Sequence, residues 1–487
     1  MESSPPPNRY YHHVVVIVLG DVGRSPRMQY HTLSLLENGF HVSLVGYSGE
    51  VLIPQLNTFQ QYHSTNNNRL HVFRFQPYNF PSFLRRGIFK PIYYILRALS
   101  LLWILFYTLF FQVSQSQHIP PVQCVLVQNP PSIPTLIIAF LFCKIQHYRT
   151  GKFVKFIIDW HNLGFTMFDV SPTHPIRRWT EKYEIYMAQK ANLHFCVTHG
   201  MKQWLLDHTN VDTKHILVLY DRPPDFFQST SNVDKHVLWK KMNTQFWDSC
   251  SHLMTMYHIP PENKDATLLT IQNHSDDGSI LLQKTRPAVL VSSTSWTPDE
   301  DFGILLHALL LLDTHIDQNQ PQSLSIFQHV LVIVTGKGPL KAMYLEKIQR
   351  LALKYVTIQT MWLEAVDYPR LLGCADLGIS LHTSTSGIDL PMKVVDMFGC
   401  QVPVCAMGFP CITELVTDTV HGRIFTTSEE LCNQLYELIF TAQGKDLLKG
   451  YRLNIQNLER WRENWNETAG ATILDLCRDD KVKIKVG

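Results

Sequence analysis

The first half of the chain alternates between short apolar runs and polar segments. Residues 12–20 are mainly β-branched, as expected of a strand buried in a parallel sheet. Residues 28–39 carry apolar side chains near helical spacing and end in glycine, which predicts a helix. Further apolar runs that end in polar loops predict strands at residues 41–47, 70–75, 122–132, 152–162, 193–200 and 215–224. This half is therefore predicted to form a doubly wound parallel sheet.

The second half repeats this alternation. Strands are predicted at residues 287–296, 329–339, 355–363, 375–387 and 402–407, with helices at 302–313 and 393–400. Residues 453–467 have the pattern of one amphipathic helix. The predicted fold class is α/β, with two Rossmann-like β/α/β domains facing across a cleft and the C-terminal helix packing back towards the N-terminal domain. The predicted segments are an N-terminal domain at 10–224, a linker helix and variable insertion at 225–286, a C-terminal domain at 287–450, and a crossing helix and tail at 451–487.

Composition narrows the class of protein. The chain has 487 residues, of which 45% are apolar and 17% charged, and this excludes a mostly disordered protein. The formal net charge of +2 gives no bulk field for nucleic acid, so no nucleic-acid partner is expected. The ten cysteines include no C-x-x-C pair, and we interpret them as small buried side chains in a reducing compartment. The first 13 residues are polar and rich in proline, which predicts no export signal.

One apolar stretch, residues 88–113, has the character of a membrane-associated segment. Its uninterrupted part, residues 98–113, is 16 residues long, shorter than the roughly 20 needed to span a bilayer. We expect it to lie in the membrane surface, the alternative being a helix buried in the domain. The basic residues expected to face anionic headgroups are Arg85, Arg86, Lys90 and Arg97. The side chains expected to contact lipid are Leu101, Leu102, Trp103, Ile104 and Phe106.

Polar residues that follow strands are the candidates for chemistry, because ligands bind at the carboxyl ends of parallel strands. The loop after the first strand contains Asp21, Gly23, Arg24 and Arg27. Its glycines allow close approach of the backbone, and the helix that follows favours an anion at its N-terminus. The spacing is not G-x-G-x-x-G, so a nicotinamide enzyme is not expected. The alternative is a tight turn with surface charges.

A second candidate group follows the strand at 152–162 and consists of Asp159, His161 and Asn162. A carboxylate, an imidazole and an amide together can position and deprotonate a hydroxyl. In the alternative interpretation, Asp159 only caps the next helix and His161 packs against Trp160.

Two turns in the second half could hold a diphosphate. The first is Gly336-Lys337-Gly338, which lacks the frame of a Walker A loop. The second, residues 382–387, places hydroxyls and a glycine before a predicted helix, and Lys393 and Asp396 share one face of that helix. The alternatives are an ordinary β/α turn and an ordinary capped helix.

Long stretches of this sequence resemble the chitobiosyldiphosphodolichol β-mannosyltransferase family. They are GDVGRSPRMQYH at residues 20–31, QNPPSIP at 128–134, DWHNLG at 159–164, LYDRPP at 219–224, VLVSSTSWTPDEDF at 289–302, TGKGPL at 335–340 and DYPRLLGCADLGISLHTSTSGIDLPMKVVDMFGC at 367–400. The resemblance runs from about residue 14 to 465, and only an insertion near 229–285 falls outside it.

The resemblance implies a GT-B glycosyltransferase. The implied reaction moves mannose from GDP-mannose to GlcNAc2-diphosphodolichol in a β-1,4 linkage, during assembly of the N-glycan precursor. The implied location is the cytosolic face of the endoplasmic reticulum membrane, with sister mannosyltransferases as candidate partners. The resemblance implies no tightly bound cofactor and no metal ligands, and it leaves room for a divalent cation acting on the substrates.

The resemblance also implies roles for particular residues. The N-terminal domain would bind the acceptor through Gly23, Arg24, Arg27, His31, Gln128, Asn129 and Asn162. The C-terminal domain would bind the donor through Gly336, Lys337, Gly338, His382, Ser384, Ser386, Gly387, Lys393 and Asp396. Asp396 would hold the ribose, although the first acid of the wider E-x7-E pattern falls on Ile388, one residue before Asp389.

Inversion of the sugar needs one displacement and a general base on the acceptor hydroxyl. The candidates for this base are His161, Asp159 and Asp21, in that order. Two other functions stay open at this point: a different GT-B transferase that uses another nucleotide sugar, and an inactive homologue that acts as a scaffold for sister mannosyltransferases.

Overall fold

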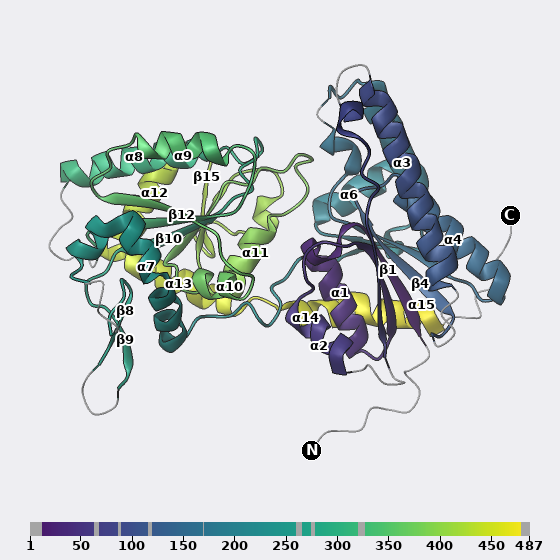
Figure 1. The fold of residues 1–487 in the computed structure, drawn as a ribbon, viewed down its shortest axis with the longest axis horizontal. Coiled ribbons are helices and arrows are strands. Elements are labelled where there is room, and N and C mark those ends of the chain that lie inside the picture. Colours follow the sequence, from purple (N-terminus) through teal and green to yellow (C-terminus); the bar gives the residue numbers. More distant parts are fainter. Residues whose placement is uncertain are drawn as a thin grey trace. The chain divides into compact units, whose positions relative to one another are not determined.

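The computed structural model describes residues 12–62, 68–85, 89–114, 119–168, 170–259, 265–273, 278–319 and 327–478. The chain divides into two compact units. Unit 1 comprises Met1–Asp221 and Trp461–Gly487, and unit 2 comprises Arg222–Arg460. Each unit is built round its own parallel sheet (Figure 1), which confirms the predicted α/β class with two Rossmann-like domains.

The sheet of unit 1 has seven parallel strands in the order β3-β2-β1-β4-β5-β6-β7. Their bounds are β1 His13–Asp21, β2 His41–Tyr47, β3 Leu70–Phe75, β4 Val122–Asn129, β5 Lys155–Trp160, β6 Leu193–Cys196 and β7 Ile216–Val218. Residues 14–17 of β1 are fully buried, because helices cover both faces of the sheet. The order of the strands reverses between β1 and β4, and ligands bind at such a switch point.

The helices of unit 1 fall into two groups. Right-handed crossovers place the helices that follow β1 and β2 on one face of the sheet and those that follow β3, β4 and β5 on the other. The α-helices are α1 Pro26–Glu37, α2 Pro54–Tyr62, α3 Lys90–Tyr107, α4 Thr135–Thr150, α5 Pro175–Ala188, α6 His199–His208, α14 Trp461–Trp465 and α15 Ala471–Arg478. Shorter turns are η1 Val22–Arg24, η2 Ser82–Arg85, η4 Thr108–Val113, η5 Gly164–Met167, η6 Thr213–His215 and η8 Asn466–Gly470.

The sheet of unit 2 has six parallel strands in the order β12-β11-β10-β13-β14-β15. The strands are β10 Ala288–Ser293, β11 Val330–Thr335, β12 Val356–Met361, β13 Leu377–Ser380, β14 Val404–Met407 and β15 Gly422–Phe425. The helices are α7 Asn232–Met256, α8 Phe302–Asn319, α9 Lys341–Gln349, α10 Asp367–Leu372, α11 Met392–Gly399, η7 Ile412–Glu414, α12 Ser428–Phe440 and α13 Ala442–Gln456. The insertion contributes α7 and an antiparallel hairpin of β8 Thr270–Gln272 and β9 Ile280–Leu282.

The prediction of one amphipathic helix at residues 453–467 is wrong. Helix α13 ends at Gln456, and α14 begins at Trp461, where the chain passes from unit 2 to unit 1. Ile455 is buried in unit 2 and Trp465 in unit 1, so the apolar positions serve two cores rather than one face. Leu453, which the single-helix pattern would bury, is 53% exposed.

The apolar helix within the predicted membrane segment is longer than the uninterrupted run at residues 98–113. Helix α3 continues into η4, and Ile92–Val113 forms a 22-residue stretch with mean hydropathy 1.8, long and apolar enough to cross a membrane. Length therefore does not exclude a span, because the helix continues through Arg97. Only 22% of the most apolar part of this stretch is buried, whereas a helix in the core of the domain would be mostly buried. Arg86 lies outside the described residues, and nothing is described for the side chains of Arg85 and Lys90.

Candidate functional site

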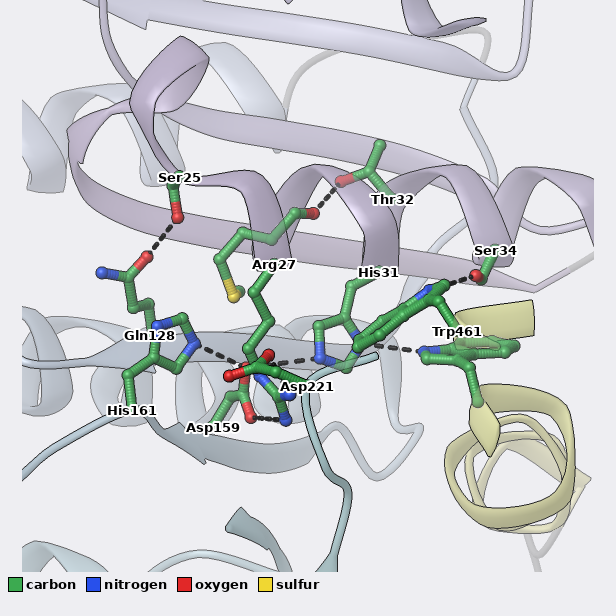
Figure 2. Close-up of polar contacts among 12 residues, drawn as sticks. Ser25, Arg27, His31, Thr32, Ser34, Gln128, Asp159, His161, Asp221 and Trp461 are labelled. Carbon is green, nitrogen blue, oxygen red and sulfur yellow. Dashed lines mark hydrogen bonds and ion pairs between the residues drawn. The ribbon is translucent and has the colours of Figure 1, made fainter. Parts of the chain in front are cut away.

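A buried charge cluster lies at the carboxyl ends of the unit 1 strands (Figure 2). Arg27, on α1, donates two hydrogen bonds to Asp159 at the end of β5, at 2.9 and 2.8 Å. The Nη1 atom of Arg27 donates a hydrogen bond to Asp221 at 2.8 Å. All three side chains are buried, and Asp159 has no exposed surface. One cation is thus shared by two carboxylates that lie 62 positions apart in the sequence, at residues 159 and 221.

Two histidines approach the same carboxylate. The Nε2 atom of His161 lies 2.8 Å from Oδ2 of Asp159, and Nε2 of His31 lies 3.3 Å from it. Burial alone would raise the pKa of Asp159, but the Arg27 charge and the contacts with His161 and His31 hold that pKa well below its usual value. Asp159 is therefore ionised, and as an acceptor-only group it fixes the proton of His161 on Nε2. The basic lone pair of His161 is then on Nδ1.

Helix α14, near the C-terminus, covers one side of this cluster. The indole of Trp461 donates to Ser34 at 3.0 Å, and the guanidinium of Arg27 lies 5.5 Å from its ring (Figure 2). The indole of Trp465 donates to Nδ1 of His31 at 2.9 Å. Burial lowers the pKa of His31, so this imidazole stays neutral beside the ion pair. Sequence reasoning missed both tryptophans, because only their amphipathic spacing was visible.

Burial separates the predicted residues of unit 1 into two sets. The His161 side chain is 23% exposed and can meet a substrate, whereas Asp159 is enclosed. Arg27, His31 and Asn129 were predicted to contact the acceptor, but their side chains are buried and two of them belong to the charge cluster. The roles of these three residues in acceptor binding stay predictions.

The loop after β1 is held by its own carboxylate. Asp21 accepts hydrogen bonds from the N–H groups of Gly23 at 2.9 Å and Glu50 at 3.0 Å. A Cβ atom at Gly23 would lie 2.4 Å from the carbonyl oxygen of Glu50, so only glycine fits there. Arg24 is exposed and pairs with Glu50 at 2.8 Å. Both carboxylate oxygens of Asp21 therefore accept hydrogen bonds from the backbone of this loop, which makes Asp21 a weak candidate for the general base.

The loops after β4 and β5 are tied to each other. The hydroxyl of Ser25 donates to Gln128 at 2.6 Å, and the amide of Gln128 donates to the carbonyl of Pro130 at 3.1 Å (Figure 2 shows the first of these). The N–H of His161 donates to the carbonyl of Asn129 at 2.8 Å. Asn162 accepts from the N–H of Leu163 at 2.7 Å. These contacts fix the backbone that carries His161.

A buried carboxylate that sequence reasoning missed lies beneath these loops. Glu184, on α5, has no exposed surface, and neither of its oxygens makes a hydrogen bond of good geometry with any described residue. Its polar neighbours are Ser132, the N–H of Gly164 and Asn129. Burial raises the pKa of Glu184 to about 7. In the sequence Glu184 looks like any polar residue of an amphipathic helix, so no local signal marked it.

In unit 2, two glycine positions allow the turn after β11 to approach the loop after β10. A Cβ atom would lie 1.9 Å from the carbonyl oxygen of Thr294 at Gly336, and 1.7 Å from that of Ser295 at Gly338. Between them, Lys337 places its ammonium 3.6 Å from the ring centre of the exposed Trp362. The predicted cation is thus accessible, and it rests on an aromatic ring that sequence reasoning did not select.

Lys393 and Asp396, which were predicted to contact the donor from one helix face, lie beside different side chains. Lys393 binds Glu300, and it lies 3.2 Å from the hydroxyl of Ser295. Glu300 is buried and also accepts from the N–H of Ser295 at 2.5 Å. Asp396 lies near Tyr368, whose pKa is raised by burial and by this carboxylate. Sequence reasoning missed Glu300, because it pairs with a lysine 93 positions away.

The serine hydroxyls of the turn at residues 384–388 form hydrogen bonds within the turn. Ser384 accepts from the N–H of Gly387 at 2.7 Å and lies 3.2 Å from the hydroxyl of Ser386. Gly387 has φ of +78°, a conformation that favours glycine. His382, two residues after β13, places its Nε2 atom 3.8 Å from the carboxylate of Asp389. The turn is therefore a folded loop before α11, as a diphosphate cradle would need, and its role stays a prediction.

Among the described residues, no group of three histidine, cysteine or acidic side chains could hold a metal ion. A cavity of about 190 Å³ in unit 2 lies near the amino ends of β10 and β13 and includes Lys235, Arg286, Asp376 and Arg452 in its lining. It contains none of the predicted donor residues, so it is distinct from the loops described above.

Two solved structures share this fold over almost the whole chain. The Anabaena protein HepE, in a crystal structure with UDP and glucose, matches with a TM-score of 0.57 and 14% identity, over 95% of this chain and 99% of that chain. Sucrose-phosphate synthase from Thermosynechococcus elongatus matches with a TM-score of 0.55 and 10% identity, over 96% of this chain and 99% of that chain. The two parallel sheets with polar loops at their carboxyl ends define the class by fold: the chain has a GT-B fold.

Curated relatives give the family. The human and Dictyostelium discoideum proteins named chitobiosyldiphosphodolichol beta-mannosyltransferase are 37% and 36% identical, over 94% and 92% of this chain and 92% and 91% of their own lengths. An Arabidopsis thaliana protein named UDP-glycosyltransferase TURAN is 39% identical over 94% of this chain and 96% of its own length. No protein-family model matches the chain. The chain belongs to the chitobiosyldiphosphodolichol β-mannosyltransferase family, which confirms the predicted resemblance.

Proposed function

We propose that this protein transfers mannose from GDP-mannose to GlcNAc2-diphosphodolichol and forms a β-1,4 linkage. The observation that carries the proposal is the family membership over more than nine-tenths of the chain. The Asp159–His161 pair supplies the general base that this chemistry needs. The inactive-scaffold alternative is disfavoured because the ion pairs that position this base are complete.

In the proposed step, Nδ1 of His161 accepts the proton of the acceptor hydroxyl. The hydroxyl oxygen forms a bond to the anomeric carbon of mannose while the bond from that carbon to the diphosphate breaks. The electron pair of the broken bond leaves with GDP, and the single displacement inverts the sugar from α to β. Asp159 stays ionised, holds the imidazole and stabilises its protonated form, as an orienting carboxylate does. Arg27 in turn keeps Asp159 charged.

Unit 2 is proposed to bind the donor. Lys337 and Lys393 would contact the diphosphate, the turn with Ser384, Ser386 and Gly387 would offer hydroxyls and N–H groups to it, and Asp396 would hold the ribose. Lys393 would have to exchange part of its contact with Glu300 for phosphate. No tightly bound cofactor is proposed, and any divalent cation would act on the substrates.

The proposed location is the cytosolic face of the endoplasmic reticulum membrane, with α3 attached to the lipid surface. Trp103 on α3 is 64% exposed, while Leu105 and Leu109 are fully buried. Helix α3 connects β3 to β4, which belong to one sheet, so a single span would pull that sheet apart. This topology favours a helix that lies in the interface. Sister mannosyltransferases are candidate partners on this surface.

A transfer assay tests the proposal. Purified protein, radiolabelled GDP-mannose and a synthetic lipid-linked chitobiose should give a β-mannosylated product, and Asp159→Asn should abolish most of it. The name of the Arabidopsis relative favours one rival, a UDP-sugar donor. Adding unlabelled GDP-mannose or unlabelled UDP-glucose to the assay distinguishes the two donors. If only UDP-glucose suppressed the transfer of label, the donor would be a UDP-sugar and the proposed donor would be wrong.

A further inference from the structure

Helix α5 presents large apolar side chains to solvent. Ile176, Trp179 and Tyr186 are 45%, 58% and 55% exposed. With the half-buried Tyr183 they follow the spacing i, i+3, i+7 and i+10, which lines one side of a helix. The adjacent side of the helix is anchored in the core by Met187 and Ala188. A helix that faces only water would carry polar side chains on its outer side, so this stripe needs a partner.

The stripe has a basic border. Arg178, Lys182 and Lys190 are exposed, and Lys190 places its ammonium 4.8 Å from the ring of Tyr186. The acidic residues of α5 are Glu181, which is half-buried, and Glu184, which is buried. The exposed charge beside the stripe is therefore positive, and it complements an anionic surface.

The stripe continues onto neighbouring helices. The N–H of Ile137 on α4 donates to the hydroxyl of Tyr183 at 3.1 Å. Along α4, exposed side chains recur at Leu141, Ile145 and Tyr148. Phe142 of α4 packs against Phe110 of η4, the continuation of α3, and their ring centres are 5.3 Å apart. Figure 1 shows α3 and α4 side by side. Three consecutive helices that contact one another thus each carry exposed apolar side chains.

The same surface reaches the loop that carries the proposed base. Turn η5 begins three residues after His161, and it ends at Met167, which is 61% exposed. Within η5, Phe165 lies 5.9 Å from the guanidinium of Arg177 on α5. Whatever binds α5 therefore lies next to the loop of His161.

We propose that α5 is a membrane-contacting element whose Ile176–Trp179–Tyr186 stripe enters the interface of an anionic bilayer. Tryptophan and tyrosine bordered by lysine and arginine are the side chains favoured at the lipid–water boundary. The stripe would hold the His161 loop at the membrane surface, where the head of a lipid-linked acceptor is exposed. This last point rests on the proposed function, because it assumes a lipid-linked acceptor.

Vesicle co-sedimentation tests the contact without using activity. The variant Trp179→Ser/Tyr186→Ser should bind phosphatidylcholine–phosphatidylserine vesicles about tenfold more weakly than the wild type, since two aromatic anchors are lost. Arg178→Gln/Lys182→Gln should lose only the increment that phosphatidylserine adds over pure phosphatidylcholine. Leu310→Ser/Leu453→Ser, at exposed positions of unit 2, is the matched control and should bind like the wild type. Equal vesicle binding by the stripe variant and the control would overturn the proposal.

Kinetics with two acceptors separate this inference from the proposed function. For the stripe variant, KM for a long-chain acceptor in vesicles should rise about tenfold, while KM for a short-chain, water-soluble acceptor should not change. An equal rise for both acceptors would indicate damage to the site and contradict a membrane role. If wild-type protein mannosylated neither acceptor, the proposed function would fail, and the vesicle result would still decide on α5. Retention of a soluble protein by the stripe, with no vesicle binding, would make the surface a protein interface instead.

Discussion

The loops at the carboxyl ends of the two sheets differ in how their charges are held. In the charge cluster of unit 1, Arg27 and Asp159 are buried and hydrogen-bonded to each other, and the imidazole of His161 is 23% exposed. In unit 2, Lys337 rests on an exposed ring and Lys393 is partly exposed beside Glu300. A catalytic base gains from a rigid, preorganised setting, whereas cations that receive a diphosphate must be free to exchange partners.

The comparison predicts that removing the central cation of unit 1 has the largest effect on stability. Arg27→Met should lower the free energy of unfolding by about 3–5 kcal/mol, because it leaves the buried charge of Asp159 without its arginine partner. Arg24→Met is the control: its side chain is 71% exposed in an ion pair, so the loss should stay below about 1 kcal/mol. Urea denaturation measures the free energy of unfolding of both variants. Equal losses would mean that the buried Arg27–Asp159 pair stabilises unit 1 no more than the exposed pair does.

Glu184 gives a test through pH. Its pKa is raised by burial from 4.5 to about 7, so the folded protein binds the proton more tightly than the unfolded chain. The resulting stabilisation is complete below about pH 4.5 and is lost as the pH rises through 7, an effect on the order of 3 kcal/mol.

Glu184→Gln should remove this dependence, since its amide does not titrate. The fall in melting temperature between about pH 5 and pH 8 should be smaller in the variant than in the wild type. Parallel curves for the two proteins would show that Glu184 does not titrate in this range.

Donor contacts in unit 2 should matter for affinity rather than stability. Asp396→Ala and Lys393→Ala should each weaken use of GDP-mannose by about 1–3 kcal/mol, through lost ribose and phosphate contacts. Lys449→Ala, at an exposed position on α13, is the control. Combining Lys393→Ala with Glu300→Gln sharpens the test: if the double variant regained wild-type KM, Lys393 would serve only to neutralise Glu300.

The smallest expected effect concerns the ring beneath Lys337. Trp362→Ala should lower the free energy of unfolding by no more than about 1 kcal/mol, because the cation–π contact is exposed. Urea denaturation measures this loss. A loss several times larger would mean that the charge of Lys337 is held as firmly as the buried charges of unit 1.

Local patterns predicted the sheets well, because β-branched runs such as residues 14–17 are buried on both sides wherever a parallel strand forms. They also selected His161 and Asp159, which follow a strand. They could not show that Arg27 is buried, since its partners Asp159 and Asp221 are 132 and 194 positions away. They failed at residues 453–467, where one apolar pattern is divided between two cores.

The kcat of His161→Ala, measured together with its affinity for GDP, tests the central claim most directly. His161 is the exposed end of a buried charge network in unit 1, and the donor is assigned to unit 2. The account predicts that kcat falls by about 10²–10⁴-fold, the usual contribution of a positioned base, while GDP binds as in the wild type. A kcat close to the wild-type value would contradict the assignment of His161 as the base.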